Sequence, residues 1–281
     1  MFNFFANIFG YVLNFIYGIV NNYGIAILLF TILLKLIMLP ISINQQKTMK
    51  KTAKIQKQTK QIQAKYKNDQ ARMNQEIMDL YKKENMSPFS GCLSSIIQII
   101  LILSMFYLVS RPLTYMKHVD SELINKYSQE IQQEKGNQRY TEIAIIRYKS
   151  EVDPSVNINM NFLGLNLSAV PSENYKDSKV FIIPILYVVT SIISTRVTTN
   201  LNKPKIQENN ETKELKKKDD DDFDMAQEMS KNMTLMMPLM TVSIALIAPL
   251  GLALYWFANN LLMLGERLAL NKFFNKSDEE V

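Results

Sequence analysis

Lys35 is the residue whose chemistry most needs explaining, because it interrupts an apolar run that extends from Tyr23 to Ile43. An ammonium group near the centre of a membrane-spanning helix costs about 3 kcal/mol on insertion scales, and it usually faces the protein interior or a water-filled cavity. No Asp or Glu lies inside the apolar runs of the chain, and Glu266 sits at the edge of the last one. We therefore expect water and polar side chains, not a carboxylate, to solvate Lys35.

Polar side chains recur at helical spacing in the apolar runs and could line one groove together with Lys35. Thr31 and Lys35 are four residues apart, and Tyr255 and Asn259 have the same separation near the other end of the chain. The predicted groove residues are Lys35, Thr31, Gln98, Ser94, Ser95, Ser191, Tyr255, Trp256 and Asn259. The alternative for each uncharged residue is a hydrogen bond to its own helix or to a neighbouring helix. That alternative explains Lys35 poorly, because its charge is costly in lipid.

The composition offers little for covalent catalysis, metal binding or cofactor binding. The 281 residues include one Cys and one His, which argues against a cysteine-based zinc site, a His-rich metal centre and a His-driven triad. Only eight Gly are present, and neither G-x-G-x-x-G nor G-x-x-x-x-G-K-[ST] occurs. Cys92 and His118 have no evident partner. We therefore expect no enzyme activity, no metal and no cofactor.

The apolar runs predict an all-α integral membrane protein. A membrane-spanning helix needs roughly 20 mainly apolar residues. Five runs meet or approach this length and carry almost no charge, so a set of buried core helices is a poor alternative. The expected transmembrane helices are residues 23–43, 88–110, 180–197, 233–249 and 250–266. The last two are short and meet at Ala248-Pro249, which is typical of a tight helical hairpin.

Residues 1–22 are apolar and aromatic but contain no Lys or Arg, which argues against a signal peptide. Their apolar side chains fall near a helical period, so we expect an amphipathic helix that lies in the membrane interface. A sixth span is the alternative.

The distribution of Lys and Arg sets the expected orientation. Residues 44–92 carry eleven Lys and Arg against four Asp and Glu, whereas residues 1–22 carry none of either kind. Because cytoplasmic loops carry the excess of Lys and Arg, this pattern predicts a cytoplasmic first loop and an outside N-terminus. Five spans then place residues 111–179 outside as an extracellular loop, and residues 267–281 in the cytoplasm as a tail.

Two further segments are expected in the cytoplasm. Residues 44–87 are rich in Lys and Gln, with a turn signal at Lys67-Asn68-Asp69, and predict a helical hairpin with a thin apolar stripe. Its positive charges could meet anionic lipid headgroups or ribosomal RNA. The alternative is a solvated linker helix. Residues 198–232 place a basic block beside an acidic one, which predicts a partly disordered loop.

Several segments, taken in order, resemble the YidC-type membrane protein insertases, in their shorter, Gram-positive-like form. The matching segments are Thr31–Lys51, Asn85–Cys92 with the downstream Gln98, Phe162–Leu165, Met237–Met240 and Gly251–Asn260. The resemblance covers nearly the whole chain. It departs at Lys35, where the family usually has arginine, so the charge is kept but the bidentate fork is lost. We expect neither the lipoprotein cysteine nor the large folded outer domain found in relatives.

The resemblance implies an insertase and chaperone in a bacterial plasma membrane, with five core helices around a positively charged, water-accessible groove open to cytoplasm and lipid. It implies nascent membrane proteins as clients, the ribosome, the Sec translocon and anionic lipids as further partners, and no DNA. The alternative function is a small transporter or channel that uses Lys35 as an anion or substrate site. The lack of intramembrane acids for proton coupling and of evident inverted repeats counts against it.

Overall fold

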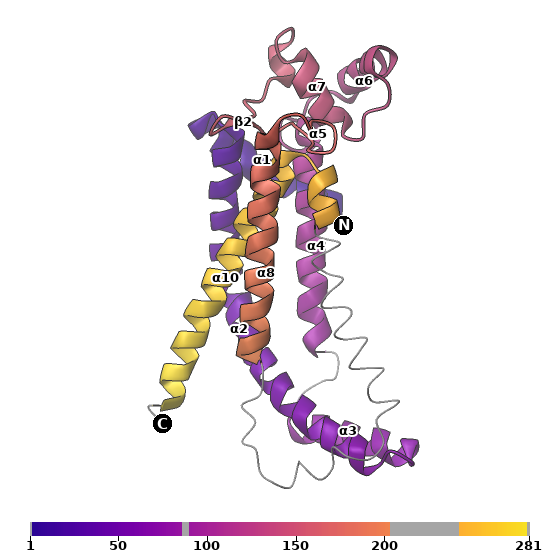
Figure 1. Cartoon of the computed structure of the whole chain (residues 1–281), viewed down its shortest axis with the longest axis vertical. Helices are drawn as coiled ribbons and strands as arrows, with labels where there is room; N and C mark the ends of the chain where they lie inside the picture. The colour runs from indigo at the N-terminus through magenta and orange to yellow at the C-terminus, as the bar shows by residue number, and fades with distance from the viewer. Residues whose placement is uncertain (1, 86–89, 203–241, 280–281) are drawn as a thin grey trace.

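The computed structural model describes residues 2–85, 90–202 and 242–279, and these are mostly helical (Figure 1). Its longer helices are α1 (Phe2–Val20), α2 (Tyr23–Lys65), α3 (Gln70–Lys83), α4 (Ser90–Ser110), α6 (Ser121–Lys135), α8 (Ile182–Asn202) and α10 (Leu250–Glu279). Its shorter elements are α5 (Pro112–Tyr115), α7 (Thr141–Lys149), η1 (Pro154–Val156), β1 (Asn161–Phe162), β2 (Leu165–Asn166) and η2 (Ser178–Phe181). In Figure 1, α5, α6 and α7 cluster at one end of α2, α4 and α8, and α3 lies at the other end.

Among the described residues, three helical segments are long and apolar enough to cross a membrane: Phe2–Val20, Tyr23–Thr48 and Ser178–Leu201. A shorter apolar stretch, Ile99–Ser110, ends α4. These segments agree with a helical integral membrane protein. Most of the segment expected to form the fourth span, and residues 203–232 of the expected cytoplasmic loop, lie outside the described residues.

α2 is one continuous helix that leaves the apolar run and continues into the polar segment after it, with Pro40 inside. Asn22 begins the helix, because its side chain accepts a hydrogen bond from the backbone N–H of Ile25. After a short turn, Asp69 caps α3 in the same way by accepting from the N–H of Arg72 at 3.0 Å. α3 packs against α2 and contains no buried residue, as expected for a thin apolar stripe.

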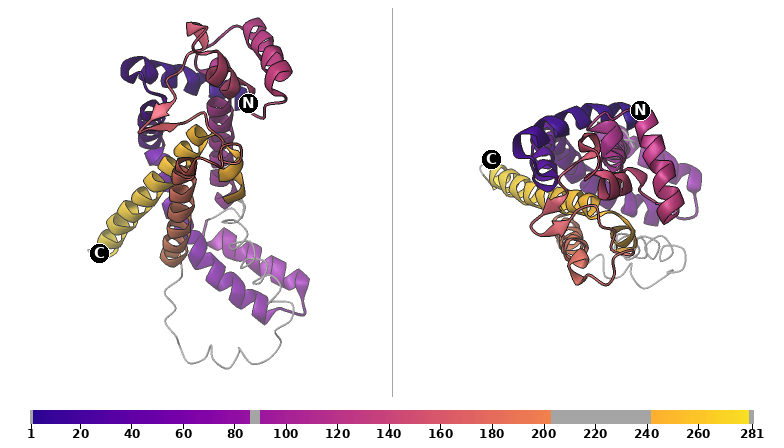
Figure 2. Two further views of the ribbon diagram at one scale, coloured as in Figure 1. Left: turned by 45° about the horizontal axis from the view of Figure 1, so that its top comes forward. Right: turned by 90° about the horizontal axis from the view of Figure 1, so that it is seen from above.

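α1 lies across one end of the long helices rather than alongside them (Figure 2). Its buried residues are Ala6, Gly10, Leu13 and Tyr17, and α1 packs against α4 and α5. The opposite face exposes large apolar side chains, at Phe4, Ile8, Tyr11, Phe15 and Ile19. A helix with one packed face and one exposed apolar face in this transverse position is suited to a membrane interface.

Residues 111–179, expected as an extracellular loop, fold into a packed unit, which is called the outer unit below after that expectation. Its core consists of side chains that are almost completely buried, at Ile131, Ile143, Ile145, Val156, Ile158 and Leu167. Glu142 joins α7 to α5, because its carboxylate accepts hydrogen bonds from the backbone N–H and the hydroxyl of Thr114 at 2.9 and 2.6 Å. Burial raises the pKa of Glu142, and the hydrogen bonds from Thr114 offset part of that rise.

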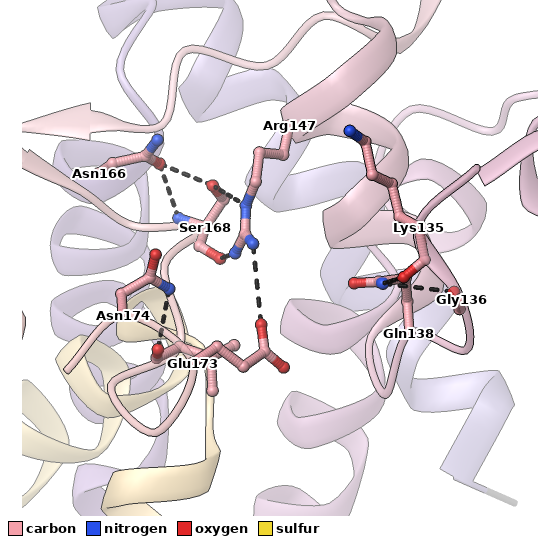
Figure 3. A network of polar contacts seen from close by, with 9 residues as sticks. Lys135, Gly136, Gln138, Arg147, Asn166, Ser168, Glu173 and Asn174 are labelled. Atoms are coloured by element: carbon pink, nitrogen blue, oxygen red, sulfur yellow. Dashed lines mark hydrogen bonds and ion pairs between the residues drawn. The ribbon is translucent and has the colours of Figure 1, made fainter. Parts of the chain in front are cut away.

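A polar network fixes α7 to the segment that follows β2 (Figure 3). The Arg147 side chain donates from Nε to the Ser168 hydroxyl at 3.4 Å, and its guanidinium also donates to the Ser168 carbonyl. The same guanidinium lies 3.8 Å from a carboxylate oxygen of Glu173. Ser168 in turn donates its hydroxyl hydrogen to Asn166 at 2.7 Å. The outer unit is therefore held together by hydrogen bonds as well as by its apolar core.

The outer unit also anchors the first residues of α2 and α10. The N–H of Tyr23 donates to the carbonyl of Asn159 at 3.0 Å. At α10, the N–H groups of Leu250 and Gly251 donate to the carbonyls of Ala169 and Leu167, both at 2.9 Å. The first N–H groups of a helix have no partner within the helix, so these bonds satisfy donors that would otherwise be unpaired in a buried position. The outer unit thereby positions two helices relative to each other.

We expect Gly10→Ala to destabilise the protein and Gly18→Ala to leave it intact. A methyl group at Gly10 would collide with the backbone carbonyl oxygen of Tyr115, so α1 would have to move away from α5. Nothing lies within 4 Å of a methyl group at Gly18. Overpacking of this kind costs about 1–3 kcal/mol, whereas Gly→Ala at an open helical position gains about 0.5–1 kcal/mol. Thermal unfolding in detergent measures both, and equal melting temperatures for the two variants would contradict the packing of α1 on α5.

Candidate functional site

A pocket surrounds Lys35 between α2, α4 and α10, and is called the Lys35 pocket below. It holds about 100 Å³ of space for water. Its polar lining comes from α2 and α10, at Lys35, Ser42, Gln45, Gln46, Tyr255, Asn259, Glu266 and Arg267. Leu101 and Ile102 of α4 supply part of its apolar lining. Charged and polar groups therefore converge on the apolar run of α2.

Glu266 lies beside Lys35, which corrects the expectation that no carboxylate reaches this charge. The Lys35 Nζ atom is 3.8 Å from Oε2 of Glu266, and the two side chains are only 23% and 12% exposed. At such burial the attraction between unit charges is stronger than at a protein surface, because less water screens it. The ammonium group is thus partly neutralised from within the protein.

The position of Glu266 follows from the length of α10. The sequence assigned residues after 266 to a tail, but α10 continues without a break to Glu279. Tyr255, Asn259, Met263 and Glu266 are separated by four, four and three residues, so they share one face of this helix. Extending the period that links Tyr255 to Asn259 by two turns would have found Glu266 from the sequence. The hydrophobic run ends earlier than the helix, so hydropathy places Glu266 at the edge of a span.

Arg267 is a second cation in the Lys35 pocket, and the sequence does not predict it there. Its Nη1 atom donates to the Thr198 hydroxyl of α8 at 2.5 Å, so the guanidinium is held between α10 and α8. Lys35 and Arg267 against Glu266 leave one net positive charge in the pocket. The sequence signal for Arg267 is weak, because a basic residue just after an apolar run is usually a membrane-interface residue.

Three of the predicted groove residues, Lys35, Tyr255 and Asn259, line the Lys35 pocket together. Thr31 is 1% exposed and its hydroxyl donates to the Ile27 carbonyl of its own helix at 2.6 Å. This bond is the local alternative that the sequence left open for each uncharged residue.

The remaining predicted residues are placed elsewhere or are not described. Trp256 contacts α8, where its ring centre is 5.9 Å from that of Tyr187. Ser191 is half-buried on α8, and neither it nor Trp256 belongs to the lining of the Lys35 pocket. Ser94, Ser95 and Gln98 belong to α4, and their side chains lie outside the described part of the structure.

Within the described ranges, no three His, Cys, Asp or Glu side chains gather as a metal site would require. The side chains that line the Lys35 pocket can offer electrostatic attraction and hydrogen bonds.

The sequence matches the family described as 60Kd inner membrane protein over residues 15–278. It is 30% identical over 267 residues to the membrane protein insertase YidC of Rickettsia prowazekii (strain Madrid E), and equally to that of Rickettsia typhi (strain ATCC VR-144 / Wilmington). Each match covers 94% of this chain and 38% of the relative. The YidC of Rickettsia felis (strain ATCC VR-1525 / URRWXCal2) is 41% identical over 96 residues, which are 34% of this chain and 17% of that protein. The chain thus spans well under half the length of these relatives.

We expect a cysteine at Ser42 to react with a small water-soluble thiol reagent and a cysteine at Thr31 to be protected. Ser42 lines the Lys35 pocket, whereas Thr31 is buried on the same helix. Cys92 is first replaced by Ser, so that each protein carries one thiol. Alkylation rates in nanodiscs are the measurement, with denatured samples as the reference for full reactivity. Equal protection at both positions would mean that water does not reach the pocket.

Proposed function

The chain belongs to the family of the 60Kd inner membrane protein, and from this premise we propose that it is an insertase and chaperone for membrane proteins in a bacterial inner membrane. The observation that carries the proposal is the charge of Lys35 in a pocket between largely apolar helices, beside Glu266 and Arg267. In this proposal the protein catalyses no covalent reaction. It lowers the free-energy barrier for moving a short polar segment of a client protein across the bilayer.

The Lys35 pocket would act by replacing part of the hydration that the client segment loses. A polar group that enters hydrocarbon without a partner costs several kcal/mol. Water in the pocket, the Ser42 hydroxyl and the Asn259 amide can hydrogen-bond such a group. The net positive charge would attract carboxylates in particular, because attraction grows as the dielectric constant falls.

The client's apolar helix would leave the pocket on the lipid side. Leu36 and Ile37 follow Lys35 along α2 and are 62% and 59% exposed, which is typical of side chains that face lipid. Moving an apolar segment from water to lipid is favourable by about 25 cal/mol per Å² of apolar surface. The polar segment and the apolar helix of a client would therefore use two neighbouring surfaces of α2.

We propose five spans, at residues 23–43, 88–110, 180–197, 233–249 and 250–266, around a groove that includes the Lys35 pocket and opens to cytoplasm and lipid. α1 would lie in the outer interface with the N-terminus outside, and the C-terminus would be cytoplasmic. The proposed orientation is supported by Figure 1, in which α1 lies at one end of the long helices and the hairpin of α2 and α3 lies at the other end. The hairpin exposes Lys65, Lys67, Arg72, Lys82 and Lys83.

The proposed partners follow from the exposed positive charges of the hairpin. The exposed cations of the hairpin would contact anionic lipid headgroups, each contributing about 1 kcal/mol near a charged surface. The same surface would meet a translating ribosome, which presents phosphates to it. Nascent membrane proteins are the proposed clients, and the Sec translocon is a proposed partner through which some of them arrive.

Lys35 should contribute its charge rather than its shape. We expect Lys35→Arg to retain client insertion, and Lys35→Ala to reduce it by about tenfold for clients with acidic translocated tails, the equivalent of 1.4 kcal/mol. Lys35→Glu should be worse for these clients, because it would face Glu266 and repel their carboxylates. The measurement is protease protection of clients in a strain depleted of its own insertase and complemented with each variant.

The matched control for the Lys35 series is Lys179→Ala, which removes an exposed lysine of η2 that does not line the pocket. Immunoblotting of membranes checks that every variant accumulates. Full activity of both Lys35→Ala and Lys35→Glu across several clients would exclude the charge mechanism. Solute flux without insertion in reconstituted liposomes would instead favour a transporter or channel.

The proposed orientation is tested with single cysteines in a Cys92→Ser background. A cysteine at Lys67, in the turn between α2 and α3, should be shielded from an impermeant thiol reagent in intact cells. A cysteine at Asn137, exposed between α6 and α7, should react. Both should react after the membrane is permeabilised. Labelling at position 67 from outside would overturn the orientation.

A further inference from the structure

The ion pair between Lys35 and Glu266 is loosely joined. Its closest atoms are 3.8 Å apart, whereas Lys149 and Glu130 of the outer unit approach to 2.6 Å. Hydrogen bonds between ammonium and carboxylate groups are usually 2.7–2.9 Å long. Lys35 and Glu266 therefore attract each other without forming a direct hydrogen bond, so separating them requires less rearrangement than separating Lys149 from Glu130.

One carboxylate oxygen of Glu266 accepts no hydrogen bond within the described part of the chain. Its Oε1 atom is buried and has no hydrogen-bond partner among the residues that the structure describes. A buried carboxylate oxygen without a donor is incompletely solvated by the protein. The Glu266 carboxylate thus lies near Lys35 through one oxygen, while its other oxygen is buried without a donor in the described ranges.

Arg267 would keep Glu266 close to a positive charge if Lys35 took another partner. Arg267 is the next residue after Glu266 along α10, and its side chain lines the same pocket and is held in place by Thr198. A carboxylate near two cations can exchange one of them without being left isolated in a medium of low dielectric constant.

We propose that Glu266 is the exchangeable counter-ion of Lys35 and sets how long an acidic client segment stays in the pocket. The inference rests on the proposed function. A client carboxylate displaces Glu266 from Lys35 on entry, and Glu266 displaces the client carboxylate on exit. Glu266 is therefore a specificity-determining residue that weakens the binding of acidic segments and speeds their release.

The physical need for such a residue follows from the charges. Without Glu266, Lys35 and Arg267 would present two positive charges to an acidic segment at membrane depth, where water screens them poorly. A segment bound that tightly would occupy the pocket instead of crossing the bilayer. With Glu266 present, the attraction between Lys35 and the client carboxylate replaces the attraction between Lys35 and Glu266, so the free energy of the exchange is close to zero.

The test is binding of two fluorescent peptides to the purified full-length chain in nanodiscs. Both peptides carry the same apolar helix, and their short tails contain either Asp or Asn at the same positions. Anisotropy gives the dissociation constants, and stopped-flow dilution gives the release rates. The variants are Glu266→Gln, Glu266→Asp, Lys35→Gln combined with Glu266→Gln, and Glu173→Gln as a control, which removes the carboxylate from another 3.8 Å ion pair.

We expect Glu266→Gln to raise the affinity for the acidic peptide relative to the neutral one by about tenfold, a coupling typical of interacting charged residues. Most of that gain should appear as slower release. Glu266→Asp should change the ratio less than Glu266→Gln because it keeps the charge, Glu173→Gln should leave the ratio unchanged, and adding Lys35→Gln should abolish the gain. An unchanged ratio, or an equal change for both peptides, would overturn the proposal and leave Glu266 as a structural partner of Lys35.

The peptide measurement does not depend on insertion, so the two proposals can fail separately. If the unmodified protein inserts no client into proteoliposomes while Glu266→Gln still changes the peptide ratio, the insertase function fails and the counter-ion role stands. If insertion proceeds and the peptide ratio does not respond, the counter-ion role fails alone.

Discussion

A positive charge inside a helical segment that is long and apolar enough to cross a membrane is the constraint on which the site depends. Lys35 lies on an otherwise apolar stretch of α2, and its ammonium group needs water, dipoles or a carboxylate nearby. The structure supplies a pocket with polar side chains from α2 and α10, the carboxylate of Glu266 at 3.8 Å and a second cation, Arg267. Because these groups come from different helices, the pocket exists only while those helices keep their relative positions.

The outer unit is what fixes those positions at one end. Its backbone carbonyls accept hydrogen bonds from the first N–H groups of α2 and α10, and α1 packs across the same end against α4 and α5. At the other end, α2 continues into its hairpin with α3, which buries no residue of α3. The two ends should therefore differ in stability, because local stability follows the number of buried apolar contacts. This difference would suit the proposed insertase, which would receive its clients from the side of the hairpin.

The sequence predicted the features that depend on local periodicity and missed those that depend on long-range packing. Lys35 is evident from the sequence because a charge within an apolar run is costly, and Tyr255 and Asn259 are evident because a spacing of four places them on one helix face. The pairing of Glu266 with Lys35 is not evident from the sequence, because the hydrophobic run ends before α10 does and hydropathy marks helix ends poorly. The packed outer unit was expected as a loop because its core joins residues as distant as Ile131 and Leu167. The Thr31 hydroxyl donates a hydrogen bond to the Ile27 carbonyl of its own helix. Periodicity alone cannot distinguish a residue that bonds in this way from one that lines a pocket.

Site-specific photocrosslinking to a stalled client tests the central claim most directly, namely that a polar client segment passes along the Lys35 pocket. The photoreactive residue is placed at Met38, which lines the pocket, or at Ile37, its exposed neighbour on α2. If the account is right, the polar tail of the client crosslinks to position 38, and its apolar helix crosslinks to position 37. A polar tail that crosslinks to neither position, while the same client is inserted, would contradict the account.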